Sequence, residues 1–249
     1  MANLLNINTW NVGTGSVTGF SDVYGTANRF YASGPWSRDE LIWRATADGV
    51  GTQGNGGWNG STLNIDITKK YRITTWCNRK VLGTLGQVYH GCYGYDASST
   101  NIGLLKIDTG GIETNPYFYW SSNPPTSNQL PLDTWVMLVG FINPFGYSGT
   151  TLNPENGGYL IDGTKLSNTS ASFFEFKWQA TNAKLAHRIY LYYSYPYTNP
   201  IQYFLYPRID ICDGTEPTIQ QLLRNKKQTI GLKTSFGSFN IQTKDVISK

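Results

Sequence analysis

The chain alternates between two kinds of position with a period of two residues from Tyr71 to Arg79. One set of alternating positions holds Tyr71, Ile73, Thr75 and Cys77, and the other set holds Arg72, Thr74, Trp76 and Asn78. Successive side chains of a β-strand point to opposite faces of its sheet, so this pattern predicts a strand with one face toward a core. A glycine-framed tryptophan, Trp58, and a Thr-Lys-Lys turn precede this strand.

Short segments of the same character recur along most of the chain, separated by clusters of Gly, Asn, Pro and Ser that favour turns. The predicted strands lie near Leu4–Trp10, Arg29–Tyr31, Leu41–Ala45, Leu63–Ile65, Tyr71–Arg79, Val88–Tyr95, Ile102–Ile107, Trp135–Asn143, Gly158–Ile161, Phe173–Trp178, His187–Ser194 and Gln202–Ile211. Many short strands with regular turn signals predict an all-β fold. We expect a two-sheet antiparallel β-sandwich of the jelly-roll type rather than βαβ units.

One short helix is predicted after the last strand, over Ile219–Leu223. The Thr-Glu-Pro tripeptide at 215–217 supplies an N-terminal signal, with a hydroxyl cap and a proline in the first turn. Cations from Arg224 to Lys227 suit the negative end of the helix dipole. We expect this helix to close one end of the sandwich.

The last 22 residues differ from the rest in pattern and in charge. Residues 228–249 are polar with isolated apolar positions and no clear period, so we divide the chain into a jelly-roll domain over 1–227 and a C-terminal arm or linker used in assembly. Six of the 20 Lys and Arg residues lie in 224–249 beside one acidic residue, Asp245. The remaining 14 basic groups face 15 acidic groups, so the body has no basic footprint for nucleic acid.

Composition agrees with a strand-rich fold and places few constraints on function. The 249 residues include 27 Gly, 17 Tyr, 11 Phe and 8 Trp but only 14% charged residues, and aromatic side chains suit a pleated, half-buried surface. Cys77, Cys92 and Cys212, which we place in strands, are expected to be buried free thiols. We see neither a secretory signal nor the roughly 20 apolar residues of a membrane helix.

An ordered set of motifs carries a resemblance to a known family. The motifs are Trp36 after a Gly-Pro turn, Ile42-Trp43-Arg44, Gly56-Gly57-Trp58-Asn59, Ile65-Asp66, Lys70–Trp76, Asn115–Phe118, Asp133-Thr134-Trp135, Gly140-Phe141-Ile142, His187–Tyr193, Pro207–Asp210 and Asp213–Ile219. From about Asn28 to Leu223 the chain resembles a domain of bacteriophage tail-fibre and other virion-surface proteins, itself similar to carbohydrate-binding jelly rolls. The resemblance implies a non-enzymatic β-sandwich on a virion, often trimeric, that contacts surface glycans.

Aromatic residues beside predicted turns are the candidate carbohydrate-binding groups, because sugar rings stack their apolar faces on flat aromatic rings. These candidates are Trp36, Trp58, Trp120, Tyr195 and Tyr197. The alternative for each is core or rim packing, which is the role that we expect for the tryptophans within strands.

No metal, cofactor or catalytic residue is assigned. Asp22, Asp48, Asp210 and Asp213 offer oxygen ligands for a structural calcium ion without a recognisable spacing. A polysaccharide lyase would need a base beside a cation, but the alternation from His187 to Tyr190 puts His187 and Arg188 on opposite faces. Asp39 and Glu40 are adjacent and fail as a glycosidase pair for the same reason.

These observations favour a non-enzymatic virion structural protein, a phage fibre or capsid-surface protein made in the host cytoplasm. We expect a homo-oligomer, with a trimer favoured, that contacts other virion subunits and binds host or environmental glycan, without nucleic acid or membrane insertion. Two alternatives stay open: a carbohydrate-active enzyme, a lyase or depolymerase on the same scaffold, and a decoration protein that binds no sugar.

Overall fold

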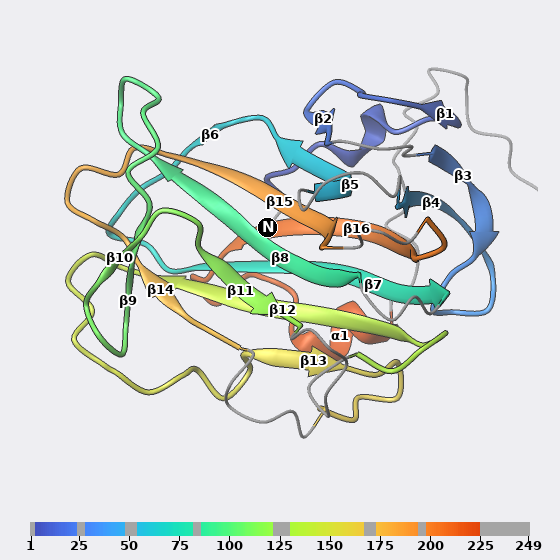
Figure 1. The fold of residues 1–249 in the computed structure, drawn as a ribbon. Coiled ribbons are helices and arrows are strands. Elements are labelled where there is room, and N and C mark those ends of the chain that lie inside the picture. The colour runs from blue at the N-terminus through green and yellow to red at the C-terminus, as the bar shows by residue number, and fades with distance from the viewer. Residues whose placement is uncertain are drawn as a thin grey trace, which may run out of the picture.

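Two β-sheets packed face to face form the body of the protein (Figure 1). The computed structural model describes residues 3–23, 28–47, 54–81, 86–121, 130–166, 173–193 and 198–224. Within these residues there is one α-helix, α1 (Ile219–Arg224), and a 3₁₀ turn, η1 (Ile7–Thr9). The predicted all-β, two-sheet antiparallel sandwich with one short C-terminal helix is therefore confirmed. The arm predicted for 228–249 lies outside the described residues.

The larger sheet, sheet A, has ten strands within the described residues. Their order is β1 (Gly13–Thr14), β3 (Asn28–Ser33), β4 (Asp39–Thr46), β16 (Ile201–Ile211), β7 (Tyr71–Val81), β12 (Trp135–Asn143), β14 (Phe176–Lys177), β9 (Leu104–Lys106) and β10 (Ile112–Glu113), with β13 (Gly157–Tyr159) paired to β12. Sheet B has the order β11 (Tyr117–Trp120), β8 (Gln87–Tyr95), β15 (Lys184–Tyr192), β5 (Gly54–Gly60) and β2 (Phe20–Asp22), with β6 (Leu63–Asn64) paired to β15. Among the strands that the structure describes, all pairs are antiparallel except β12 with β14.

Alternate positions along each strand face the space between the sheets, as the sequence pattern predicts for β7. On β7, Tyr71, Ile73 and Cys77 belong to the core between the layers, and Trp76 packs on the outside of sheet A. The centre of the core is aromatic: the Trp58 ring lies 5.2 Å from Trp43 and 5.7 Å from Phe204, centroid to centroid. Edge-to-face pairs of this kind are favourable beyond the apolar area that they bury.

Helix α1 covers the outer face of sheet A. Its residues Ile219 and Leu223 are buried in a second apolar cluster with Trp76 and Met137. The expectation that it closes one end of the sandwich is therefore wrong, because its two apolar side chains meet the apolar outer positions of β7 and β12. The cap also differs from the prediction: Thr218, not Thr215, accepts a hydrogen bond from the backbone N–H of Gln221.

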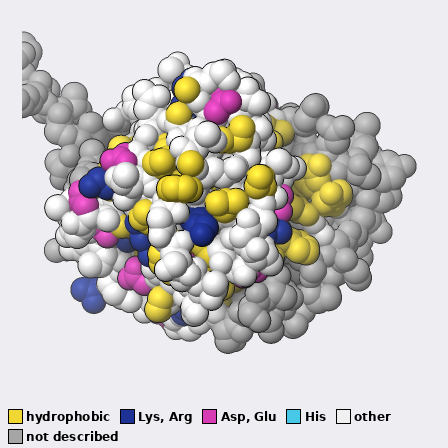
Figure 2. Space-filling view, turned by 90° about the vertical axis from the view of Figure 1, so that its left-hand side faces the viewer, with side chains coloured by type: hydrophobic (Ala, Val, Ile, Leu, Met, Phe, Trp, Pro, Cys, Tyr) yellow, Lys and Arg dark blue, Asp and Glu magenta, His cyan; other side chains and the backbone are white. Residues whose placement is uncertain are grey.

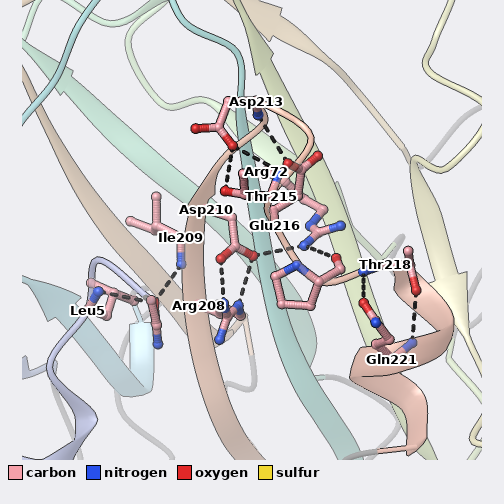
Figure 3. A network of polar contacts seen from close by, with 12 residues as sticks. Leu5, Arg72, Arg208, Ile209, Asp210, Asp213, Thr215, Glu216, Thr218 and Gln221 are labelled. Carbon is pink, nitrogen blue, oxygen red and sulfur yellow. Dashed lines mark hydrogen bonds and ion pairs between the residues drawn. The ribbon is translucent and has the colours of Figure 1, made fainter. Parts of the chain in front are cut away.

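A buried ion network ties the end of β16 to the segment that leads into α1 (Figure 3). Asp210 is fully buried and accepts hydrogen bonds from Arg72 (2.9 Å) and from Arg208 (2.8 Å). Arg72 also donates to the carbonyl oxygen of Pro217 at 2.6 Å. Each arginine thus shares the carboxylate that would otherwise be an unpaired buried charge, and Arg72 fixes where the chain turns toward the helix.

Two neutral histidines meet between the sheets. The indole N–H of Trp58 donates to Nδ1 of His187 at 3.0 Å, so the proton of that ring is on Nε2, which lies 2.9 Å from Thr75 Oγ1. His90 Nε2 lies 3.4 Å from the same hydroxyl. Both rings are fully buried, and burial lowers the pKa of His90 to about 3 and that of His187 well below its usual value.

Two assignments of strand and loop segments are also wrong. Leu4–Trp10 forms no strand; the Asn6 side chain instead accepts from the N–H of Asn8 and caps η1. The glycine-rich segment before Trp58 is one of the clusters that we placed in turns between the predicted strands, but Gly54–Gly60 forms strand β5. A Cβ on Gly57 would lie 2.0 Å from the carbonyl oxygen of Ile189, so glycine is needed there for close approach to β15 rather than for a turn.

The cysteines are free thiols, as predicted, and Cys77 and Cys92 are fully buried in strands. The prediction for Cys212 is wrong in part, because it is half-buried and lies just beyond the end of β16. Burial raises the pKa of Cys92 to about 12, and the same cause raises the pKa of Cys212 to about 12. In the part of the chain that the structure describes, no helix is long and apolar enough to cross a membrane.

Candidate functional site

Tyrosines gather on the outer face of sheet B. Along β8 and β15 the buried positions alternate with aromatic ones, because His90, Cys92 and His187 point toward the core while their neighbours point outward. We call the outward set the tyrosine face; it comprises Tyr89, Tyr93, Tyr117, Trp120, Tyr190 and Tyr192.

A β-bulge brings two residues of β11 onto this face. Tyr117 pairs with Gly91 and Tyr119 with His90, so the register shifts between them. With regular alternation Tyr117 and Trp120 would point to opposite sides, but the bulge adds one residue and turns both toward Tyr89. The Tyr89 ring centroid lies 4.6 Å from that of Tyr117 and 6.4 Å from that of Trp120.

Two of these rings, Tyr89 and Trp120, form a nearly parallel row with Phe174. Phe174, from the segment before β14, lies 6.4 Å from Trp120 with an interplanar angle of 1°, and Trp120 lies at 18° to Tyr89. Flat aromatic faces held in one orientation are the feature that stacks against the C–H face of a sugar ring. Tyr193, at the rim beside Tyr89, is 39% exposed and has a left-handed backbone conformation (φ 52°).

This row lines a hollow of about 220 Å³ where the edges of the two sheets meet. Its walls come from β8 and β11 of sheet B, from β9 and β10 of sheet A, and from the segment that enters β14; the lining residues are Tyr89, Lys106, Glu113, Asn115, Tyr117, Trp120, Phe174 and Phe176. The volume is below the ~300–1,000 Å³ of closed small-molecule sites, which suits a single ring of a longer ligand.

The polar groups of the hollow are balanced in charge. Lys106 Nζ lies 3.1 Å from Glu113 Oε2, and each side chain is about one third exposed. Burial raises the pKa of Tyr117 to about 12, and burial also raises the pKa of Tyr89. Both phenols therefore keep their protons at neutral pH and act as hydrogen-bond donors and acceptors; the Tyr89 hydroxyl donates to Gln87 at 2.7 Å.

Arg188 lies beneath the tyrosine face. Its guanidinium carbon is 3.7 Å from the ring centroid of Tyr93 and 4.0 Å from that of Tyr117. Nη1 donates to Asn115 Oδ1 at 3.2 Å. Gly91, which pairs with Arg188, carries no side chain, and a Cβ there would lie 2.8 Å from Cδ1 of Tyr117. A glycine at this position leaves room for the ring that contacts Arg188.

The predicted binding residues do not come together. Trp120 lines the hollow; Trp36 lies on the outer face of sheet A, where its indole N–H donates to the carbonyl oxygen of Leu223. The expected exposure of Trp58 is wrong, since this side chain is fully buried in the core. Tyr195 and Tyr197 lie outside the described residues.

Sequence reasoning passed over several residues of the hollow, among them Tyr89, Asn115 and Phe174. The period-two tyrosines of 89–95, each beside a buried position, were the available signal for an aromatic outer face. Lys106 of β9 and Glu113 of β10 could not be identified from the local sequence. They line the hollow only because the edge of sheet A lies beside the edge of sheet B.

The prediction that His187 and Arg188 lie on opposite faces of one strand is confirmed. His187 points into the core, where it is fully buried and bonded to Trp58, whereas Arg188 contacts the rings of the tyrosine face. Among the candidate oxygen ligands, Asp210 is engaged by two arginines and Asp48 lies outside the described residues. The described part of the chain contains no group of three His, Cys, Asp or Glu side chains placed to hold a metal ion.

Charges are mixed on the surface turned toward the viewer in Figure 2. Lys and Arg side chains are interspersed there with Asp, Glu and hydrophobic ones. The side chains coloured on that face do not form the continuous basic patch that a nucleic-acid backbone requires.

No model of a known protein family matches the chain, and no curated protein matches its sequence. Among solved structures it is similar to an exo-β-agarase (9% identity, TM-score 0.46), covering 89% of this chain but only 26% of that one. It is also similar to a C-terminal family 22 carbohydrate-binding module from Clostridium thermocellum (13% identity, TM-score 0.41, covering 86% and 99%). A third similar structure is a family 11 carbohydrate-binding module from Clostridium thermocellum in complex with a β-1,3-1,4-mixed-linked tetrasaccharide. Its sequence identity is 12% and its TM-score 0.33, and the match covers 85% of this chain and 92% of that one. At these scores the likenesses carry no argument about function.

Proposed function

We propose that this protein binds polysaccharide on the tyrosine face, with the hollow as the subsite for one sugar ring. The observation that carries the proposal is the nearly parallel row of Phe174, Trp120 and Tyr89 along the wall of the hollow. The row supplies apolar stacking surfaces, and Asn115 and the phenols supply the few convergent polar groups that fix the orientation of a ligand.

The proposed ligand is an uncharged glycan. Lys106 and Glu113 already neutralise each other at the hollow, and Arg188 is fully buried. A uronate or sulfate would have to compete with Glu113 for the ammonium group of Lys106. Hydroxyl groups, in contrast, can donate to Glu113 and accept from Lys106 without breaking the pair.

Binding is tested by titrating neutral and acidic oligosaccharides into the parent protein and into Trp120→Ala. Loss of the central ring of the row should weaken binding at least tenfold, about 1.4 kcal/mol. Tyr31→Ala is the matched control, because Tyr31 is 65% exposed on β3 of the other sheet. If the parent protein binds none of the glycans at high concentration, the proposal is refuted and a decoration protein that binds no sugar is favoured.

We propose a binding role without turnover, and the same glycans test it. Incubation with acidic and neutral polysaccharides, followed by assays for reducing ends and for the absorbance of unsaturated uronates, should detect no product. Product formed by the parent protein would instead identify a lyase or depolymerase.

The setting that we propose is the surface of a virion, and this part rests on the ordered sequence motifs alone. There the chain would act as a homo-oligomer, with a trimer favoured, beside other virion subunits. Native mass spectrometry tests the assembly: a strict monomer at micromolar concentration contradicts it. Absence of the chain from purified particles would contradict the setting.

A further inference from the structure

Arg188 is a buried cation in an unusual environment. It lies on β15, with β8 and β5 on either side, and its side chain is fully buried. Only Nη1 has a hydrogen-bond partner among the described residues, at Asn115; Nε and Nη2 have none. No carboxylate of the described residues lies within ion-pair distance of it.

The needs of the fold alone do not explain this arginine. Removing a guanidinium from water is costly, and even a buried ion pair can often be replaced by apolar side chains of similar volume without loss of stability. The attraction of the Tyr93 and Tyr117 rings offsets part of this cost, since a cation over an aromatic face is favourable. The ring contacts do not offset the cost of burying Nε and Nη2 without hydrogen-bond partners.

Arg188 contacts residues that line the hollow. One face of the guanidinium meets Tyr117, whose ring touches Tyr89, and Nη1 holds the amide of Asn115. Tyr117, Tyr89 and Asn115 all line the hollow, whereas Arg188 itself does not. The arginine is therefore placed to fix the position of binding groups that it supports from below.

We propose that Arg188 is a positioning residue for glycan binding: it clamps Tyr117 and Asn115 in the orientation that the ligand requires, and its burial costs stability. This inference rests on the proposed function. Lysine cannot replace it, because a compact ammonium does not lie flat between two rings and at the same time donate in-plane to Asn115.

The test compares Arg188→Met and Arg188→Lys with the parent protein in three measurements: glycan affinity, urea midpoint, and hydrogen exchange of the segment 115–121. We expect Arg188→Met to bind at least tenfold more weakly with an equal or higher midpoint, to exchange faster in 115–121, and not to be rescued by Arg188→Lys. Arg44→Met is the matched control, since Arg44 lies over a ring (Phe30, 5.5 Å) on the other sheet; its affinity should match that of the parent.

Three results would overturn the inference. If Arg188→Met binds within twofold of the parent, the clamp is unnecessary, although the proposed function stands. If affinity falls only together with the midpoint, or Arg188→Met fails to fold, the role is structural. If the parent binds no glycan, the proposed function fails, and unchanged exchange in 115–121 then refutes the clamp as well.

Discussion

Mild acid should destabilise this protein through the two histidines between its sheets. His90 and His187 are fully buried and neutral, and the Trp58 indole donates to Nδ1 of His187, so that nitrogen cannot take up a proton without losing the bond. In the unfolded chain both imidazoles regain ordinary solvation. Lowering the pH from 7 to 5 therefore protonates the unfolded state and leaves the folded state unchanged.

The magnitude follows from the shift in pKa. The pKa of His90 is about 3 in the folded protein, against 6.5 for an ordinary histidine, and that of His187 is also well below 6.5. A depressed histidine pKa leaves stability intact above about pH 6.5 and lowers it as the pH falls toward the folded value. At pH 5 each histidine removes about 2 kcal/mol from the free energy of unfolding, so the pair removes about 4 kcal/mol.

The assay is urea unfolding followed by tryptophan fluorescence at pH 7 and pH 5. His90→Gln and His187→Gln serve as internal controls, because glutamine keeps a donor and an acceptor but does not titrate. Each variant should lose about 2 kcal/mol less than the parent between the two pH values. A parent that loses under 1 kcal/mol, or variants with the pH dependence of the parent, would refute the argument that these rings are buried neutral.

Three further predictions concern the fold. Gly57→Ala should destabilise by at least about 3 kcal/mol or prevent folding, measured by urea midpoint, since its Cβ would lie 2.0 Å from Ile189 O; a normal midpoint would contradict the β5–β15 contact. Thr218→Ala should lower the free energy of unfolding by about 1 kcal/mol, because it removes the hydroxyl that accepts the hydrogen bond from the N–H of Gln221. An unchanged stability would contradict the assignment of Thr218 as the helix cap. Cys92 should react with iodoacetamide only after unfolding, because its pKa is about 12 and its thiol is buried; rapid native labelling monitored by mass would disprove this.

The strands with clear alternation could be predicted from sequence, and those built around glycine could not. Trp135–Asn143 was expected and found with the same bounds, because its apolar run lies at the centre of sheet A. Gly54–Gly60 was missed since glycine serves both turns and close backbone approach, and only the neighbour decides which. In β5 that neighbour is Ile189 on β15, more than a hundred residues away along the chain.

The hollow was less predictable than the fold for a related reason. Tyr117 and Trp120 are three residues apart, a spacing that puts side chains on opposite faces of a regular strand. The β-bulge that brings both side chains to the same face cannot be predicted from the local sequence. Glu113 reaches the hollow from the outermost strand of the other sheet. A site made where two sheet edges meet depends on register and topology, which a single sequence leaves open.

Residues 187 and 188 show why the two broad faces of sheet B have such different chemistry. An imidazole can shed its proton, so His187 fits the core as a neutral ring bonded to Trp58 and Thr75. A guanidinium keeps its charge at any accessible pH, so Arg188 is held on the outer face by aromatic rings, which attract a cation without neutralising it. On sheet A the outer face carries an apolar cluster, which includes Trp76 and Met137 and is covered by α1. The tyrosines of sheet B need no such cover, because their hydroxyls keep an aromatic surface compatible with water. This difference is why we propose the glycan site on sheet B and not on sheet A.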